Sequence, residues 1–378
     1  MKVLKYIINW TVWSLLALYL VLVISLRIPA VQQYIGSQAA SVLSHQLGTK
    51  VSIGRIDLGF FNRIIIDDLS IYDQQQKEML RTKRLSAKID ILSLLQSRIN
   101  ISSAQLFGAR AVLYQATKDS PANFQFALDS LASKDTTNQK PLDLRINSFI
   151  MRHSSIQYDQ LDVAPTQGRF NPAHLNMQDI SAHLQLKVLR EDSLNLNVKR
   201  LSLNELSGLT INQISFKLLM NRQHAQLTNF LLQMPDTHFL LDSLLATYTI
   251  KPTPTGEKIE NLSYQGAISN SYITPSDLRA FMPSLKNYQS KIDVAIAFYG
   301  TEQKLNLTQL NISSPHDDID ISGSGWADQL GHQPTWHAQI DNMTLSDKTL
   351  DFLTKGVGVP PILRRIGTLR LKGALRRR

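Results

Sequence analysis

Most of the chain alternates apolar and polar residues with a period of two, and this pattern limits the folds that it can adopt. Val51 and Ile53 begin the alternation, and Ile56 and Leu58 continue it after a one-residue slip at Gly54–Arg55. A period of two places successive side chains on opposite faces of a strand, and a slip beside a glycine predicts a β-bulge. The sequence therefore predicts a mainly β fold.

The same alternation recurs through the rest of the chain. It is clear at 85–91, at 184–198 and at 305–310, where polar residues such as Asn, Ser and Lys separate the apolar ones. Runs at hairpin spacing, with prolines between them, predict an antiparallel sheet of about eighteen to twenty strands. Each strand has one apolar face, which must contact something other than water. A second sheet packed on the first, as in two sandwich domains, would cover this apolar face. An apolar ligand would also cover it.

The apolar residues of these strands are the candidates for a ligand-lining face. From the pattern alone, the core of an ordinary sandwich is the better explanation of each one. The candidate positions are Val51, Ile53, Ile56, Leu58, Ile89, Ile91, Leu184, Leu186, Leu196, Val198, Ile211, Phe216, Leu305 and Leu307.

A stretch without charge occupies residues 7–26. Twenty residues of helix span about 30 Å, the thickness of a bilayer's hydrocarbon core, so residues 1–28 predict a short cytoplasmic start and a single transmembrane helix. A cleaved signal peptide is the alternative, but no small-residue cleavage site follows closely. Basic residues are more numerous before the stretch than after it, which predicts a cytoplasmic N-terminus. The residues assigned to the membrane interface are Lys2, Lys5, Trp10, Trp13 and Arg27.

Helical spacing replaces the alternation in residues 29–48. Pro29 suits an early helix position and Gly48 suits a left-handed position just past the end, so an amphipathic helix is predicted. Two further short helices are expected, one opened by Thr274–Pro275 and one capped by Ser346. The chain therefore combines a few helices with its strands.

The polar stretch at 133–140 (SKDTTNQK) predicts a linker. It separates a β module at 49–132 from a longer repeating β segment at 141–345. Residues 346–378 hold the last short helix and a basic strand that breaks off, which indicates a truncated or shortened chain.

The net charge of the chain at first suggests a nucleic-acid partner, because 40 basic residues stand against 30 acidic ones. Eight of the basic residues lie from Lys355 onward, where no acidic residue occurs. The rest of the chain is therefore nearly neutral, and nucleic-acid binding is not expected.

Chemistry-bearing motifs are also missing. There is no cysteine, which excludes disulfides, thiol catalysis and Cys-ligated metals. The nine histidines are scattered singly, and no phosphate-binding loop or dinucleotide fingerprint occurs. We therefore expect no catalytic, cofactor or metal site, and no enzyme activity.

The order of segments resembles the N-terminal module of the AsmA-like proteins, and most of all their TamB (translocation and assembly module) branch. An anchor and an amphipathic helix come first, and a fixed series of β segments follows. The segments that carry the resemblance are GTKVSIGRIDLGFF at 48–61, IIIDDLSIYD at 64–73, LSAKIDILSLL at 85–95, PANFQFAL at 121–128 and TPSDLRAFMP at 274–283.

The resemblance implies an inner-membrane protein of a Gram-negative bacterium whose bulk lies in the periplasm. It implies a single anchor followed by an elongated antiparallel β-groove, a curled sheet that holds phospholipid acyl chains. The implied roles are phospholipid transport to the outer membrane and outer-membrane protein assembly, with an Omp85-type barrel as partner. The alternative that needs no lipid is an anchored β-sandwich scaffold or adhesin.

Overall fold

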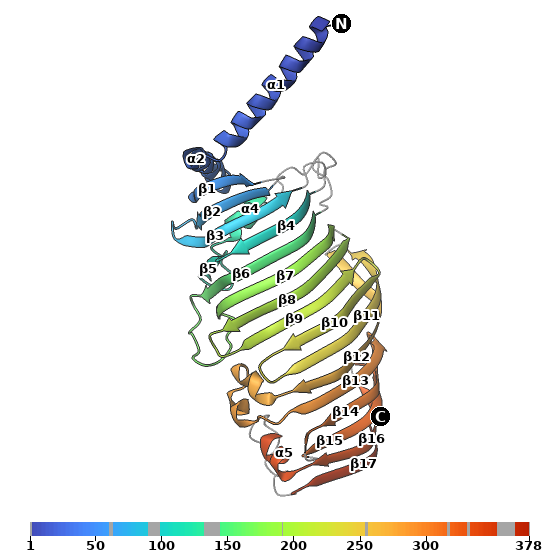
Figure 1. Ribbon diagram of the computed structural model, residues 1–378. Helices are drawn as coiled ribbons and strands as arrows, with labels where there is room; N and C mark the ends of the chain where they lie inside the picture. The colour runs from blue at the N-terminus through green and yellow to red at the C-terminus, as the bar shows by residue number, and fades with distance from the viewer. Residues whose placement is uncertain are drawn as a thin grey trace.

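The computed structural model shows a projecting helix, a second short helix and one long curled sheet (Figure 1). It describes residues 2–59, 63–89, 99–131, 144–190, 192–253, 256–315, 318–330, 333–353 and 367–377. The helices are α1 (Lys2–Ser25), α2 (Pro29–Leu47), α4 (Gln125–Leu131), η1 (Pro275–Ala280), η2 (Pro283–Asn287) and α5 (Asp347–Phe352). The strands are β1 (Val51–Gly59), β2 (Arg63–Tyr72), β3 (Glu78–Ile89), β4 (Ile99–Phe107), β5 (Arg110–Gln115), β6 (Leu144–Gln160), β7 (His174–Arg190), β8 (Ser193–Glu205), β9 (Thr210–Met220), β10 (His224–Gln233), β11 (His238–Thr253), β12 (Gly256–Ile273), β13 (Ile292–Thr301), β14 (Lys304–Ser313), β15 (Ile319–Asp328), β16 (Thr335–Leu345) and β17 (Leu369–Arg377).

The sheet confirms the mainly β, antiparallel expectation, with 17 strands in the described residues. All 17 belong to one sheet, so the described residues do not form two sandwich domains. Nearly every strand pairs antiparallel with the next one in the sequence. The exception is β6, which runs parallel to β4 and β5, two short strands that both pair with β3 on their other side. This parallel crossover, which contains α4, was not predicted.

Helix α1 projects away from the sheet (Figure 1), and its side chains are largely exposed, with Trp10 at 77% and Trp13 at 63%. The structure describes α1 side chains from Trp10 to Val21 and again at the last two helix positions, so those of Lys2 and Lys5 lie outside it. Across the described residues, no helix has the length and apolar content needed to cross a membrane. The transmembrane helix expected at 7–26 stays a prediction.

Helix α2 covers the beginning of the sheet. It starts at Pro29 and is followed by Gly48 in the left-handed conformation (φ +65°), as the sequence predicts. Gly36 allows close approach, because a Cβ there would lie 3.2 Å from the Cα of Arg55 on β1. The Oγ of Ser44 accepts a hydrogen bond of 2.9 Å from the backbone N–H of Val51. The helix thereby satisfies part of the outer edge of β1, which would otherwise be open.

The apolar side of α2 and the first strands form what we call the closed core. Its buried residues are Ala40, Val51, Ile53, Ile56 and Leu69, all at most 9% exposed. Partly buried residues of α2, β2 and β3 surround them, including Leu43, Ile66 and Leu85. This part of the sheet therefore has an ordinary two-layer core.

Short helices border the later strands. η1 follows Thr274, and α5 follows Ser346, whose Oγ accepts a hydrogen bond from the N–H of Thr349, as predicted for a cap. η1 also places the fully buried Ala280 against Leu209 and Met234, and we call this group the rim cluster. The polar linker predicted at 133–140 lies outside the described residues.

Candidate functional site

Apolar residues form continuous rows across the sheet, at right angles to the strands. Residues that pair directly in a sheet point to the same face, so the register of each strand pair shows which residues share a row. The first row runs from β4 to β17 and consists of Ile101, Ile146, Leu186, Leu196, Leu218, Leu227, Leu244, Gly266, Phe298, Leu307, Gly325, Ala338 and Leu375. Every member is apolar or glycine.

A second row runs beside the first in two segments. The first segment is Ile64, Ala87, Ala104, Phe149, Leu184, Val198 and Phe216. The second is Phe230, Leu241, Ile268, Ile296, Leu310, Gly323, Ile340 and Gly373. They meet at Phe216 and Phe230, whose ring centroids are 6.1 Å apart.

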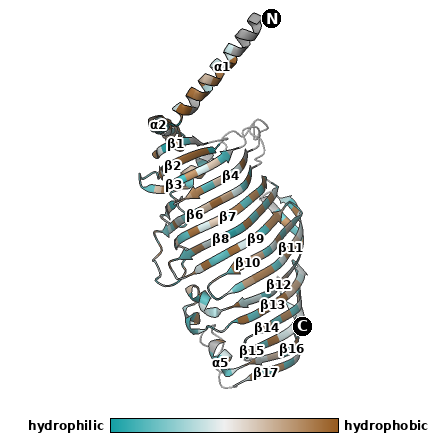
Figure 2. Cartoon of the chain, viewed as in Figure 1, coloured by the Kyte–Doolittle hydropathy of each residue, from teal (hydrophilic) through white to brown (hydrophobic). Residues whose placement is uncertain are grey.

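We call the side of the sheet that carries both rows the apolar face, and the other side the polar face. Figure 2 shows hydrophobic and hydrophilic residues alternating along the strands, as this division requires. The first row crosses 13 strands, which corresponds to about 58 Å at about 4.8 Å per strand. From β4 onward no second sheet covers the rows in the described residues, and most of their side chains remain half-buried.

Bulges keep the apolar face continuous. Asp68, Asp179 and Asn229 adopt left-handed backbone conformations within their strands, at φ of 51° to 53°. Each shifts the alternation by one residue, so apolar residues three positions apart return to the same face. Ile66 and Leu69 flank Asp68 in this way. Asp and Asn tolerate this conformation because their short polar side chains bond locally.

The one-residue slip predicted at Gly54–Arg55 lies opposite one of these bulges. Asp68 of β2 lies opposite Gly54, with its Cβ 3.1 Å from where a glycine Cβ would be. Because both strands slip together, the register between β1 and β2 continues unbroken on either side. Ile53 and Ile56 therefore both enter the closed core.

The structure separates the predicted face residues into groups. Val51, Ile53 and Ile56 lie in the closed core under α2, and Ile211 packs against the rim cluster, so these four are not on open surface. Leu58 pairs with Ile64 and Ile89 with Ile101, which places both in register with the rows. Ile91 lies outside the described residues. Val198 lies in the second row but is buried, at 7% exposed. The predicted residues on the open apolar face are Leu184, Leu186, Leu196, Phe216, Leu305 and Leu307.

The sequence reasoning missed the glycines of the apolar face. Gly323 and Gly325 belong to the second and first rows, and beside them lies a hollow of about 240 Å³. Its walls include Leu305, Trp336 and Ile340. The signal was the Gly-Ser-Gly spacing at 323–325, which alternates in the same way as the aliphatic residues of neighbouring strands.

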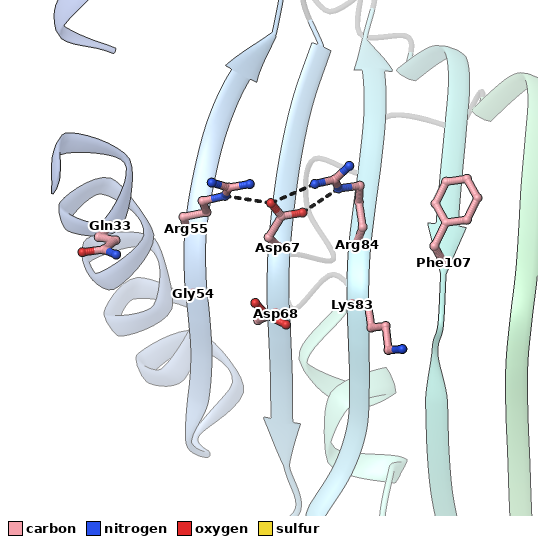
Figure 3. Close-up of a pocket in the computed structure, with 8 residues that line it drawn as sticks. All are labelled: Gln33, Gly54, Arg55, Asp67, Asp68, Lys83, Arg84 and Phe107. Carbon is pink, nitrogen blue, oxygen red and sulfur yellow. Dashed lines mark hydrogen bonds and ion pairs between the residues drawn. The ribbon is translucent and has the colours of Figure 1, made fainter. Parts of the chain in front are cut away.

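A larger hollow, of about 720 Å³, lies on the polar face beside β1–β3 (Figure 3). The Nε of Arg55 donates to Oδ2 of Asp67 at 2.8 Å, and the Nε of Arg84 donates to Oδ1 at 2.7 Å. The Asp67 side chain is only 11% exposed. The hydrogen bond from Arg84, together with that from Arg55, lowers the pKa of Asp67.

These three charges form an ion-paired clamp across β1, β2 and β3. One carboxylate binds both guanidinium groups, so the clamp joins the strands rather than leaving its cations free for a ligand. In the described residues, no three His, Asp or Glu side chains gather in a way that could hold a metal ion.

Comparison with protein-family models, curated proteins and solved structures gives no match for this chain. The rows of the apolar face are therefore the main basis for assigning a function.

Proposed function

We propose that this protein binds lipid acyl chains along its apolar face and is attached to a membrane through α1. The observation that carries the proposal is the first row, 13 apolar residues or glycines in unbroken register across the sheet. No second sheet covers that row from β4 onward in the described residues.

The chemistry of an acyl chain suits this surface. A hydrocarbon chain has no hydrogen-bonding groups, so its binding surface should be apolar and free of unpaired polar atoms. Neither row contains a charged or polar side chain. Burial of each methylene contributes about 0.8 kcal/mol, so even partial coverage of a chain would hold it firmly.

The length of the rows also supports the proposal. A bilayer's hydrocarbon core is about 30 Å thick, so one acyl chain spans about 15 Å. The first row, at about 58 Å, equals nearly four such lengths. We propose that lipids move along this surface, because successive positions on it are chemically alike.

We further propose that the chain is an AsmA-like protein of the TamB branch. Support comes from the order of the segments at 48–61, 64–73 and 274–283 and from the single long curled sheet. On this proposal the protein is anchored in the inner membrane and its sheet lies in the periplasm. It then acts in phospholipid transport to the outer membrane, in outer-membrane protein assembly with an Omp85-type barrel, or in both.

Photocrosslinking of the full chain tests lipid binding. A photoreactive amino acid replaces Leu218 on the apolar face of β9, and a matched variant carries it at Lys217, the preceding residue on the polar face. We expect phospholipid adducts, identified by mass spectrometry, at 218 and not at 217. Lipid held only around α1 would label neither position.

A pair of matched charge substitutions tests whether lipid binding depends on the apolar face. Leu196→Glu places a carboxylate in the first row, and Asn195→Glu places the same carboxylate on the polar face one residue away. We expect Leu196→Glu to abolish the adduct at 218 and Asn195→Glu to leave it unchanged. A wild-type chain without adducts at 218, or equal loss in both variants, would refute the lipid-binding function and favour a structural scaffold.

A further inference from the structure

The apolar face changes character between β14 and β16. In the first row Leu186, Leu196 and Leu218 fill positions on β7–β9, but Gly325 and Ala338 fill the same row on β15 and β16. The second row changes in the same way at Gly323. The hollow of about 240 Å³ lies at this place.

The floor of the hollow is backbone that cannot carry side chains. A Cβ on Gly325 would lie 2.6 Å from the carbonyl oxygen of His337, and a Cβ on Gly323 would meet the carbonyl oxygen of Gln339. In both cases the separation is far below the van der Waals contact distance between a carbon and an oxygen atom, so neither position can carry a side chain. The pairing of β15 with β16 therefore fixes the depth of the hollow.

The dimensions of the hollow fit one extended chain. Its wall on β14 runs from Leu305 to Leu310, about 17 Å at about 3.4 Å per residue, and one acyl chain spans about 15 Å. Spread over 15 Å, the volume leaves a cross-section of about 16 Å². An α-helix about 10 Å wide has a cross-section of roughly 80 Å², so it would lie over the hollow rather than inside it. An extended peptide would leave backbone polar groups without partners on the apolar wall.

Positive charge lies at one end of the hollow. β14 begins at Lys304, β15 ends at Asp328 and β17 ends at Arg377, so these residues share one rim of the sheet. Lys304 pairs with Asp328 at 3.1 Å, and Arg377 lies in register with Trp336, a wall residue of the hollow. Arg377 pairs with Trp336 and therefore lies on the apolar face, at the rim end of the hollow, whereas Lys304 and Asp328 pair with each other on the polar face.

We infer that the hollow is a fixed binding site for a single unbranched acyl chain of an anionic lipid, with the head group at the rim beside Arg377. The inference rests on the proposed lipid-binding function and adds one position where a moving lipid is held. The chain lies along β14 to β16, parallel to the strands, with its methyl end near Ile340.

Fluorescence quenching tests this site in the full chain, held in amphipol. The probe is a stearic acid brominated at mid-chain, which quenches a nearby tryptophan, and Trp336 lines the hollow. The measurement uses a chain with Trp10→Phe, Trp13→Phe and Trp326→Phe, so that Trp336 is the only tryptophan, and we expect saturable quenching that is lost when Trp336→Phe is added. Ala338→Phe fills the hollow and should weaken the apparent affinity at least tenfold. Ala297→Phe adds the same ring on the polar face of β13 and should not change it.

Further variants separate the contribution of the charged rim from that of the apolar hollow. Arg377→Glu should weaken binding of the brominated acid about tenfold and leave its uncharged methyl ester unaffected, whereas Lys304→Glu, on the polar face, should change neither. Ala338→Leu provides a smaller filling substitution if Ala338→Phe fails to give a wild-type circular dichroism spectrum. Equal weakening of acid and ester would overturn the head-group position.

The outcomes also distinguish this site from the general function. Adducts at 218 with no saturable quenching, or with Ala338→Phe and Ala338→Leu both binding like wild type, would overturn the fixed site and leave the lipid-binding face intact. Absence of both adducts and quenching would overturn both proposals.

Discussion

The first three strands and the later ones share a sequence pattern but differ in what covers them. On β1–β3 the apolar residues lie beneath α2, and Ile53 and Leu69 are each 8% exposed. On β7–β9 the equivalent rows carry Leu186, Leu196 and Leu218, which remain half-buried. Alternation in the sequence therefore identifies which face of a strand is apolar. It does not show whether that face is covered, because the covering helix α2 comes from a separate segment, residues 29–48.

The largest expected effect contrasts a charge in the two regions. Ile53→Glu would bury an unpaired carboxylate in the closed core and should cost about 5 kcal/mol, enough to prevent folding of the first strands. Leu196→Glu can reach water and should cost about 1 kcal/mol or less. Urea unfolding followed by circular dichroism measures both. Similar losses in the two variants would show that the later rows are covered after all.

A smaller effect is expected from the ion-paired clamp beneath the covered strands. Asp67→Asn removes the negative charge that accepts three hydrogen bonds from Arg55 and Arg84, and it should lower the free energy of unfolding by about 2 kcal/mol at neutral pH. The folded-state pKa of Asp67 is lowered, so its contribution is present above pH 3.8 and is lost as the pH falls through the folded-state pKa. Unfolding curves of wild type and variant should therefore converge in acid. A constant difference down to the lowest pH would contradict the clamp.

The contact between α2 and the edge of β1 should have a still smaller effect. Ser44→Ala leaves the N–H of Val51 without its acceptor and should cost about 1 kcal/mol. Ser41→Ala, on the exposed side of α2, is the matched control and should be neutral or slightly stabilising. Hydrogen exchange at Val51 should accelerate in the first variant only. Equal exchange in both would mean that α2 does not protect this edge.

The smallest effect belongs to the uncovered region. His174 Nδ1 lies 2.8 Å from Oδ1 of Asp159, and Nε2 lies 2.7 Å from the carbonyl oxygen of Val163. Both neighbours are acceptors, so the doubly protonated ring fits best, and the hydrogen bond with Asp159 raises the pKa of His174. Its contribution, about 0.5 kcal/mol, is complete below pH 6.5 and is lost as the pH rises through the raised pKa.

His174→Gln provides the measurement for this contact. Stability of the variant should match wild type at alkaline pH and fall below it at pH 5, as followed by thermal unfolding. The reverse trend would show that the neutral ring is the form that holds the β6–β7 loop.

Much of the fold follows from local sequence signals. Pro29 and Gly48 bound α2, Ser346 caps α5, and alternation identifies the antiparallel strands, because each signal depends on neighbouring residues alone. The parallel pairing of β6 with β4 and β5 could not be predicted in this way, because alternation does not specify a strand's partner.

The candidate site was predicted only in part, for a related reason. Leu184, Leu196 and Leu307 were correctly placed on one face by their period. Burial of Val51 and Ile53 depends on where α2 folds back, which is a long-range contact. Left-handed residues such as Asn229 carry a weak local signal, since Asn and Asp tolerate this conformation, but many of them adopt ordinary ones.

The order of the strands has a consequence for how the chain folds. From β6 to β17 each strand pairs with the strand just before it in the sequence. Each strand can therefore form its hydrogen bonds as soon as the preceding strand is in place. Stability in such a quasi-one-dimensional array is a sum of nearest-neighbour terms, and short-range pairing speeds folding. Because α2 covers β1, we expect the covered strands to fold first and the later strands to join one after another.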